Sequence, residues 1–251
     1  MNMKAEELSP LGKYEEGMPW NAVEKVIMER RSIRSYRKDP LPDTMIERIL
    51  EAGRFAPSSG NCQPWRFIVV KSPEILAAME RDAARFVKLL MFFLDYTRGG
   101  ALRRFLVKPL AKIVIRFRKN EFHPVPFSLM SKIATGETRV FHNAPTLLLL
   151  AEDRRGVSLP SIDIGVCGQS MVLAAHSLGA GSCWIGLIKL LMYMPWWRKR
   201  LGIRYPYRLE ACLAVGWQKP KADGMVPREV QVVEWLEGGL KDGPRYTRQG
   251  E

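Results

Sequence analysis

The sequence predicts an α+β fold, in which a central sheet of mixed strand direction is flanked by helices. Short apolar runs are typical of strands buried on both faces, and TLLLL after Pro145 is the most continuous of them. Other segments have apolar residues at helical spacing. No internal repeat and no low-complexity linker divides the 251 residues, so we expect one domain over 1–251.

Two helices are predicted near the N-terminus. The segment 21–30 has helical spacing and ends in arginines. A second helix begins after Pro42, where either Asp43 or Thr44 is expected to cap it through a side-chain oxygen. This helix is expected to stop near Gly53.

A third helix is predicted to open at Pro73, and a fourth to span 162–178. The fourth is apolar nearly all round, so it must be buried in a core or against a partner chain. The predicted strands are 67–70, the run after Pro145, 182–185, 209–215 and an edge strand at 229–235.

Composition indicates which partners and which cellular compartment to expect. A hydrophobic fraction of 47% and a charged fraction of 26% are ordinary for a globular chain, but the net charge of +13 favours anionic partners. The four cysteines have no paired spacing, which argues against zinc and disulfides and favours a reducing cytoplasm. The first ten residues lack the apolar stretch of a signal peptide, and no apolar run reaches the length of a membrane span.

The segment 86–127 combines apolar pieces with many cations. Ten Lys and Arg residues lie between positions 85 and 119, where Asp95 is the one acidic residue. An amphipathic helical excursion with solvated basic faces, a lid over an active site, and peripheral membrane contact through 86–119 all fit this pattern. We expect helices that wall a pocket, because the apolar residues need cover.

Two short stretches carry candidate ligand-binding chemistry. The stretch 30–36, RRSIRSY, places three guanidiniums and a hydroxyl within five residues, and Arg binds phosphate oxygens in a bidentate fork. The stretch 56–65, APSSGNCQPW, is a polar loop that leads into an apolar run. Such a loop suits the polar edge of a planar cofactor.

These stretches, followed by 161–186 (SIDIGVCGQSMVLAAHSLGAGSCWIG) and 214–228 (AVGWQKPKADGMVPR), closely resemble the signatures of the nitroreductase family, whose members bind FMN. The resemblance covers roughly 20–236 and is interrupted by the insertion at about 86–127. It implies a nitroreductase-like fold with a mixed, mainly antiparallel sheet. It also implies an interlocked homodimer with two sites at the interface.

The resemblance assigns FMN contacts residue by residue. Arg30 and Ser32 are expected at the phosphate and Arg34 at the pyrimidine edge of the ring, while the backbone N–H at or near Gly186 is expected to reach the reactive flavin nitrogen. Asp163 suits either the flavin side or the N-cap of its helix. The full predicted set is Arg30, Arg31, Ser32, Arg34, Pro57, Ser58, Ser59, Asn61, Asp163, Trp184, Ile185, Gly186 and Arg228. No catalytic side chain and no metal ligand is predicted, because the flavin carries the chemistry.

We therefore expect an FMN-dependent oxidoreductase that passes hydride from NAD(P)H to an electron-poor acceptor of the nitroaromatic or quinone type. The alternatives within the fold are a reductive dehalogenase, a flavin-fragmenting enzyme, a metabolite dehydrogenase and a membrane-associated basic flavoprotein. A basic membrane- or nucleic-acid-binding module without the chemistry is disfavoured, because the arginines of the signatures are retained. No nucleic-acid partner is expected.

Overall fold

The computed structural model describes residues 19–95, 100, 105, 107–109, 124–157, 159–220, 233–236, 239 and 245–247. The chain divides into two compact units, 30–223 and the combination of 1–29 with 224–251. Arg228 and most of the predicted insertion lie outside the described residues.

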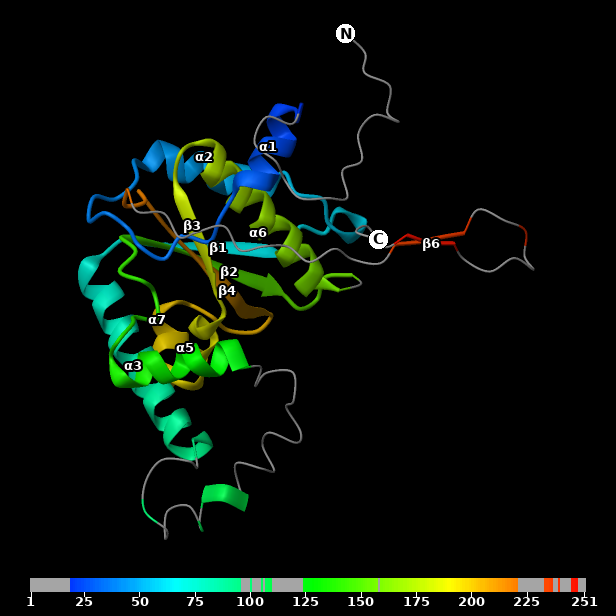
Figure 1. Cartoon of the computed structure of the whole chain (residues 1–251). Helices are drawn as coiled ribbons and strands as arrows, with labels where there is room; N and C mark the ends of the chain where they lie inside the picture. The colour runs from blue at the N-terminus through cyan, green and yellow to red at the C-terminus, as the bar shows by residue number, and fades with distance from the viewer. Residues whose placement is uncertain are drawn as a thin grey trace. The chain divides into compact units, whose positions relative to one another are not determined.

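The larger unit is organised around a four-stranded sheet with the order β1-β2-β4-β3 (Figure 1). Its strands are β1 (Trp65–Val70), β2 (Thr146–Asp153), β3 (Gly181–Ile185) and β4 (Tyr207–Gly216). All three pairings are antiparallel. A parallel bridge between Ser32 and Ser182 adds a short extended segment beside β3, which makes the pairing mixed as predicted.

Helices cover both faces of this sheet (Figure 1). One face packs against α2 (Asp43–Arg54) and α6 (Pro160–Ser177). The other packs against α3 (Pro73–Leu94), α5 (Pro124–Thr135), η4 (Gly186–Tyr193) and α7 (Pro195–Arg200). The predicted α+β class, with a mainly antiparallel sheet flanked by helices, is thus confirmed.

Strand β2 shows why its sequence forms a central strand. Leu147 and Leu149 belong to the apolar core on the α3 side, and Leu148 and Leu150 belong to the core on the α6 side. All four are fully buried. A strand that contributes to two cores needs apolar residues at every position, because successive side chains point to opposite faces.

Two helix boundaries differ from the prediction. The N-cap of α2 is Pro42, and no side chain caps the helix, so the expectation that Asp43 or Thr44 caps it is wrong. Both residues lie inside the first turn, and Asp43 pairs with Lys71 instead. Helix α3, capped by Ser72, continues past Phe86 to Leu94, so the first part of the predicted insertion extends a core helix.

The described residues of the smaller unit form one helix and a two-stranded sheet. Helix α1 (Ala22–Glu29) ends just before the arginine cluster, as predicted, and Asn21 accepts hydrogen bonds from the N–H groups of Val23 and Glu24. The strand expected at 229–235 is described as β5 (Val233–Trp235), which pairs with β6 (Arg245–Thr247). Residues 229–232 lie outside the described part.

Candidate functional site

The arginine cluster lies along the outer edge of β3. The backbone N–H of Ile33 donates to the carbonyl of Ser182 at 2.9 Å, within the parallel bridge formed by Ser32. The Ile33 side chain is buried against Gly181, where a Cβ would lie only 3.0 Å from it. Because neighbouring side chains in an extended segment alternate, the buried Ile33 leaves Ser32 half-buried and Arg34 exposed.

Hydrogen bonds to the backbone hold this segment in place. Arg31 Nη1 donates to the carbonyl of Arg30 at 2.9 Å, and Arg34 Nη1 lies 3.3 Å from the carbonyl of Ser32. The buried Tyr36 hydroxyl lies 2.6 Å from the Ile33 carbonyl and 3.1 Å from the Ala214 carbonyl of β4. The segment is therefore fixed at both ends, which limits the entropy that a ligand must remove on binding.

The polar loop lies elsewhere in the chain, next to the start of α6. The short helix η2 (Ser59–Asn61) has positive φ at Gly60 and Asn61, and Gln63 also has positive φ. Ser58 Oγ accepts the N–H of Gln63 at 2.9 Å, and Asn61 Oδ1 accepts from the Gln63 side chain at 3.0 Å. Pro57 and Asn61 are exposed, so the loop presents polar atoms to solvent.

Asp163 connects this loop to α6. Its Oδ1 accepts the backbone N–H of Ser59 at 3.3 Å. Its side chain is buried, and Oδ2 has no hydrogen-bond partner in the described structure. The N-cap of α6 is Leu159, and Asp163 lies in the first turn, within the N-cap region, where its side chain accepts from the polar loop. A buried carboxylate oxygen without a partner is costly, which makes this oxygen a candidate acceptor for a ligand donor.

The residues at the end of β3 point in different directions. The Trp184 ring packs against Gly168 of α6, where an added Cβ would lie 2.1 Å from the ring. The Ile185 side chain is buried in the core on the α3 side, so it offers a ligand only its backbone. Gly186 is exposed, and a Cβ there would meet nothing within 4 Å. The backbone at Gly186 is thus open to close approach.

The predicted residues fall into groups along α6. Ser182, beside Ser32, lies at the start of β3, just after the C-terminal end of α6. Trp184 contacts the middle of the helix at Gly168, and the loop with Ser59 contacts its first turn at Asp163. The fourteen residue steps from Asp163 to Ser177, at the end of α6, span about 21 Å at 1.5 Å per residue. Within one chain, the loop and the bridge at Ser32 therefore lie at opposite ends of α6.

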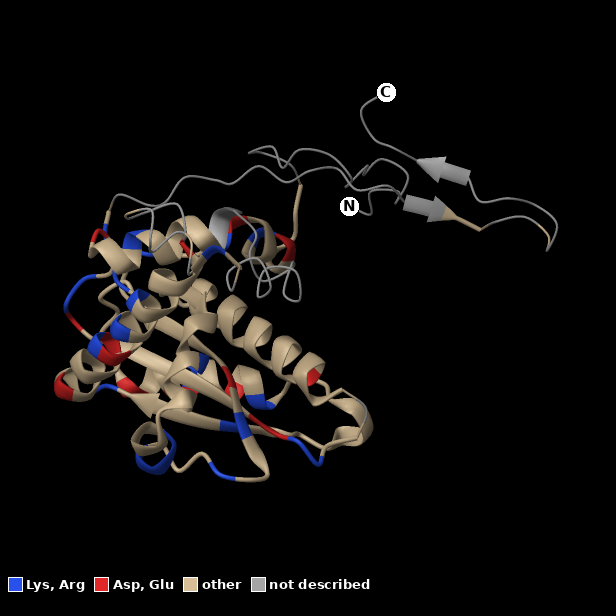
Figure 2. Ribbon diagram, turned by 90° about the horizontal axis from the view of Figure 1, so that it is seen from below, with Lys and Arg blue, Asp and Glu red and all other residues tan. Residues whose placement is uncertain are grey.

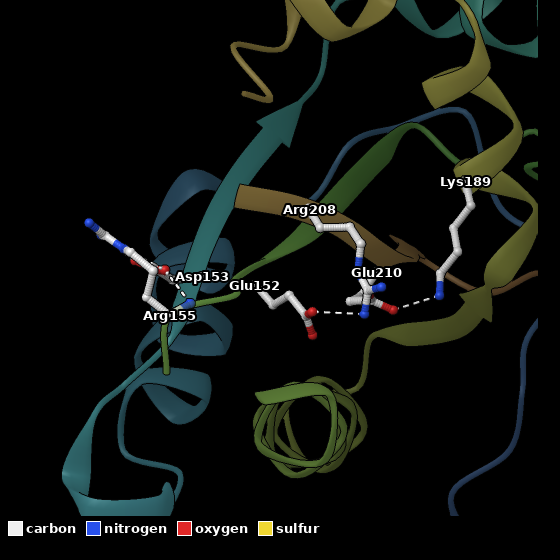
Figure 3. Close-up of polar contacts among 6 residues, drawn as sticks. All are labelled: Glu152, Asp153, Arg155, Lys189, Arg208 and Glu210. Atoms are coloured by element: carbon white, nitrogen blue, oxygen red, sulfur yellow. Dashed lines mark hydrogen bonds and ion pairs between the residues drawn. The ribbon is translucent and has the colours of Figure 1, made fainter. Parts of the chain in front are cut away.

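A charged network at the end of the sheet was not predicted from the sequence (Figure 3). Arg208 of β4 contacts Glu152 of β2 at 2.8 Å and also pairs with Glu210, whose other oxygen contacts Lys189 of η4 at 2.5 Å. Burial raises the pKa of Glu152, and the neighbouring Glu210 carboxylate raises it further. The one available signal was the acidic pair Glu152-Asp153 directly after an apolar strand.

Other candidate chemistry is sparse in the described residues. Cys167, Cys183 and Cys212 are buried free thiols, Cys62 is an exposed one, and burial raises the pKa of Cys167 to about 12. No group of His, Cys, Asp and Glu in the described part is arranged to hold a metal ion. No described helix is both long and apolar enough to cross a bilayer. Lysine and arginine are spread over several helices and loops of the described part (Figure 2).

Comparison with known proteins agrees with this layout. The model of the family described as "Nitroreductase family" matches residues 27–217. The chain is 27% identical over 203 residues to an Archaeoglobus fulgidus protein that carries the name NADH dehydrogenase/NAD(P)H nitroreductase, covering 79% of this chain and 87% of that protein. It is 40% identical over 209 residues to 5,6-dimethylbenzimidazole synthase of Rhodospirillum rubrum, covering 82% and 85% of the two chains.

A shorter match and a solved structure complete the comparison. The match to NADH dehydrogenase of Thermus thermophilus, 53% identical, covers 57 residues, which are 23% of this chain and 27% of that protein. A nitroreductase with bound FMN from Bacteroides fragilis superposes with a TM-score of 0.63 at 21% identity, covering 87% of this chain and all of that one. The family match extends over most of the chain and includes the arginine cluster, the polar loop and β3, so this protein is a member of the nitroreductase family.

Proposed function

We propose that this chain is an FMN-dependent oxidoreductase that takes hydride from NADH or NADPH and reduces an electron-poor acceptor of the nitroaromatic or quinone type. Membership of the family supports an oxidoreductase, and FMN is bound in the related structure from Bacteroides fragilis. The observation that carries the proposal is the fixed arginine segment on the edge of β3, a strand that ends at the open backbone of Gly186.

The described residues fit the two ends of this cofactor. Arg30, Arg31 and Ser32 would hold the phosphate, because guanidinium and hydroxyl donors suit its oxygens. Arg34 would place a cation at the pyrimidine edge of the ring, where negative charge develops on reduction. When bound, FMN supplies hydride transfer, and the chain contributes position, charge and the exclusion of water.

The separation of the two predicted groups along α6 supports an interlocked homodimer. We propose that Ser58, Ser59 and Asn61 of one chain complete the site that the arginine cluster of the other chain begins. Within one chain the loop lies at the first turn of α6 and the arginines at its far end. Two copies related by a twofold axis would place the loop of each chain at the arginine cluster of the other, which makes two complete sites. The proposed compartment is the cytoplasm, which suits four free thiols.

The proposed role of the segment after α3 is a lid that restricts the acceptor. The last turns of α3 expose Leu89, Phe92 and Phe93, next to Lys88. Val87, Met91 and Leu94 of the same turns are buried in the core, so a variant that tests the lid must keep them. Replacing 98–119 by a short Gly-Ser linker removes most of the basic stretch and leaves α3 intact.

The decisive experiment is anaerobic reduction of the purified flavoprotein by NADH and by NADPH, followed by a screen of acceptors. We expect non-covalent FMN and rapid bleaching by at least one nicotinamide. Arg34→Gln should slow the reduction by about tenfold or more, since one lost charge-assisted contact is worth about 1.5–3 kcal/mol. Arg48→Gln, an exposed change on α2, is the matched control.

Three results would redirect the proposal. Release of FAD, or no flavin binding at micromolar concentration, would contradict it. Formation of dimethylbenzimidazole from reduced FMN in air would identify a flavin-fragmenting enzyme, like the relative from Rhodospirillum rubrum. An unchanged acceptor profile in the linker variant, with loss of binding to anionic vesicles, would replace the lid by membrane contact.

A further inference from the structure

A cavity of about 320 Å³ lies at the opposite edge of the sheet from β3 and contains none of the described predicted flavin ligands. It is lined by Lys38, Pro40, Lys71, Pro73, Leu76, Ala77, Glu80, Arg139, Phe141, Asn143, Ala144 and Pro145. Lys71 directly follows β1 and Pro145 directly precedes β2, whereas Ser32 lies beyond β3. In the order β1-β2-β4-β3, strand β4 separates the part of the cavity wall next to β1 and β2 from β3, and Lys38 of the wall lies two residues after Tyr36 of the arginine stretch.

The charge in this cavity is positive. Lys38, Lys71 and Arg139 line it, and the acidic residue among the lining residues is Glu80. Lys71 is paired with Asp43 of α2, but Lys38 and Arg139 form no ion pair with a described residue. Helix α3, which is 22 residues long, begins at Pro73 in the cavity wall, so the positive end of its dipole adds to the same potential.

Glu80 is already engaged with the backbone. Its two oxygens accept the N–H groups of Val140 and Phe141 at 2.8 and 3.0 Å. These bonds hold the turn that carries Arg139 against α3 and direct the Glu80 carboxylate to backbone donors. The carboxylate therefore positions Arg139 and does not neutralise it by a direct ion pair.

The rest of the wall is apolar. Leu76 and Ala77 come from α3, and Phe141, Ala144 and Pro145 come from the segment that leads into β2. A volume of about 320 Å³ is at the lower end of the range for small-molecule sites, which begins at about 300 Å³. The cavity thus has room for one ring and offers cations at its rim.

We propose that this cavity binds a small organic anion, a carboxylate or phosphate attached to one apolar ring. Arg139 and Lys38 contact the anionic group, and the wall formed by Leu76, Ala77 and Phe141 contacts the ring. The site is independent of the flavin site and of the proposed reaction. A ligand here bridges α3 to the turn before β2, so it stabilises the packing of α3 on the sheet.

Binding is measured on the flavin-loaded protein by isothermal titration with benzoate, phenyl phosphate, inorganic phosphate and benzyl alcohol. Phenyl phosphate or benzoate should bind more tightly than inorganic phosphate or benzyl alcohol, because only the first two offer both ring and charge. The ratio of phenyl phosphate to benzoate affinity distinguishes the two anion classes. Arg139→Gln should weaken the better ligand by about tenfold or more.

Two further variants make the test specific to the cavity. Ala77→Phe should fill the ring space, so it should remove the advantage of the ringed anions and leave inorganic phosphate unaffected. Arg48→Gln removes an exposed cation outside the cavity and should change no affinity. Equal effects of Arg139→Gln and Arg48→Gln, or unchanged binding in Ala77→Phe, would overturn the proposal. If the protein does not bind FMN, the same titrations are made on the flavin-free protein, so the two proposals fail separately.

Discussion

Neighbouring residues of one extended segment have different roles: Ile33 anchors the segment, and Ser32 stays accessible to a potential ligand. Ile33 is buried against Gly181, and its N–H bonds to β3, so it anchors the segment. Ser32 and Arg34, on either side of Ile33 in sequence, keep their side chains accessible. The sequence pattern RRSIRSY contains this alternation, whereas the candidate phosphate contacts follow from the resemblance to the nitroreductase family and stay predictions.

The buried carboxylates could not be predicted in the same way. Asp163 and Glu152 each keep one oxygen without a hydrogen-bond partner in the described structure. Their burial depends on packing between α6 and β2, which one-dimensional periodicity does not report. The positive φ angles of the two non-glycine residues Asn61 and Gln63 likewise depend on tertiary contacts of the loop at the start of α6.

The first prediction at this scale concerns Glu152. Its pKa is raised in the folded protein, so the folded state binds more protons than the unfolded state above the ordinary glutamate pKa of about 4.3. The parent protein therefore becomes less stable as pH rises above that value, because Glu152 then loses its proton in a buried site. In Glu152→Gln this loss of stability should disappear, because the amide does not titrate but can still accept from Arg208.

Urea unfolding at pH 5 and pH 7 checks this prediction. Relative to the parent, Glu152→Gln should have a higher free energy of unfolding at pH 7 than at pH 5, because only the parent loses a proton at this position over that range. Glu47→Gln, exposed on α2, provides the control and should show no such gain. A pH-independent difference between Glu152→Gln and the parent would contradict the assignment.

At the scale of elements, helix α6 and strand β3 depend on one close contact. Gly168 faces Trp184, and an added Cβ would lie 2.1 Å from the ring. The sequence predicted both elements from composition and turn residues, and it predicted that α6 needed cover. It could not predict which small residue of the helix would meet the indole, because that depends on the rotation of α6 over the sheet.

The second prediction is that Gly168→Ala destabilises the fold. Alanine favours the helix by about 1 kcal/mol, but overpacking a core costs about 1–3 kcal/mol, and a rigid indole cannot yield easily. Gly165→Ala on the same helix has no neighbour within 4 Å and should be more stable than Gly168→Ala by about 2 kcal/mol. Denaturant midpoints measure the difference. Adding Trp184→Leu should restore part of the loss, and no restoration would show that the indole is not the cause.

At the scale of the molecule, the sequence predicted the sheet with helices on both faces, because the run 147–151 of β2 is apolar at every position. It did not predict the strand order β1-β2-β4-β3, since strand order depends on crossovers between distant segments. Among the candidate site residues, the grouping along α6 also required the fold. Arg228 and the basic stretch after α3 stay predictions, because they lie outside the described residues.

The last prediction concerns assembly. Ile162 and Val166 lie four residues apart on one face of α6 and are 57% and 38% exposed. An apolar helix face that also separates two halves of a site is suited to contact a second copy of the chain. We expect the flavin-loaded protein to have about twice the chain mass of 28.7 kDa in light scattering.

A charge placed on this face tests the interface directly. Val166→Asp should shift the mass toward the monomer and lower FMN content in parallel, because each site would lose the loop contributed by the partner and a buried, unpaired carboxylate is costly at an interface. Tyr205→Asp introduces the same charge at an exposed position near the start of β4 and should leave both mass and flavin unchanged. If Val166→Asp dissociates the dimer while FMN stays fully bound, the loop of Ser58, Ser59 and Asn61 does not complete the partner's site. A flavin-loaded monomer of the parent protein would exclude the dimer itself.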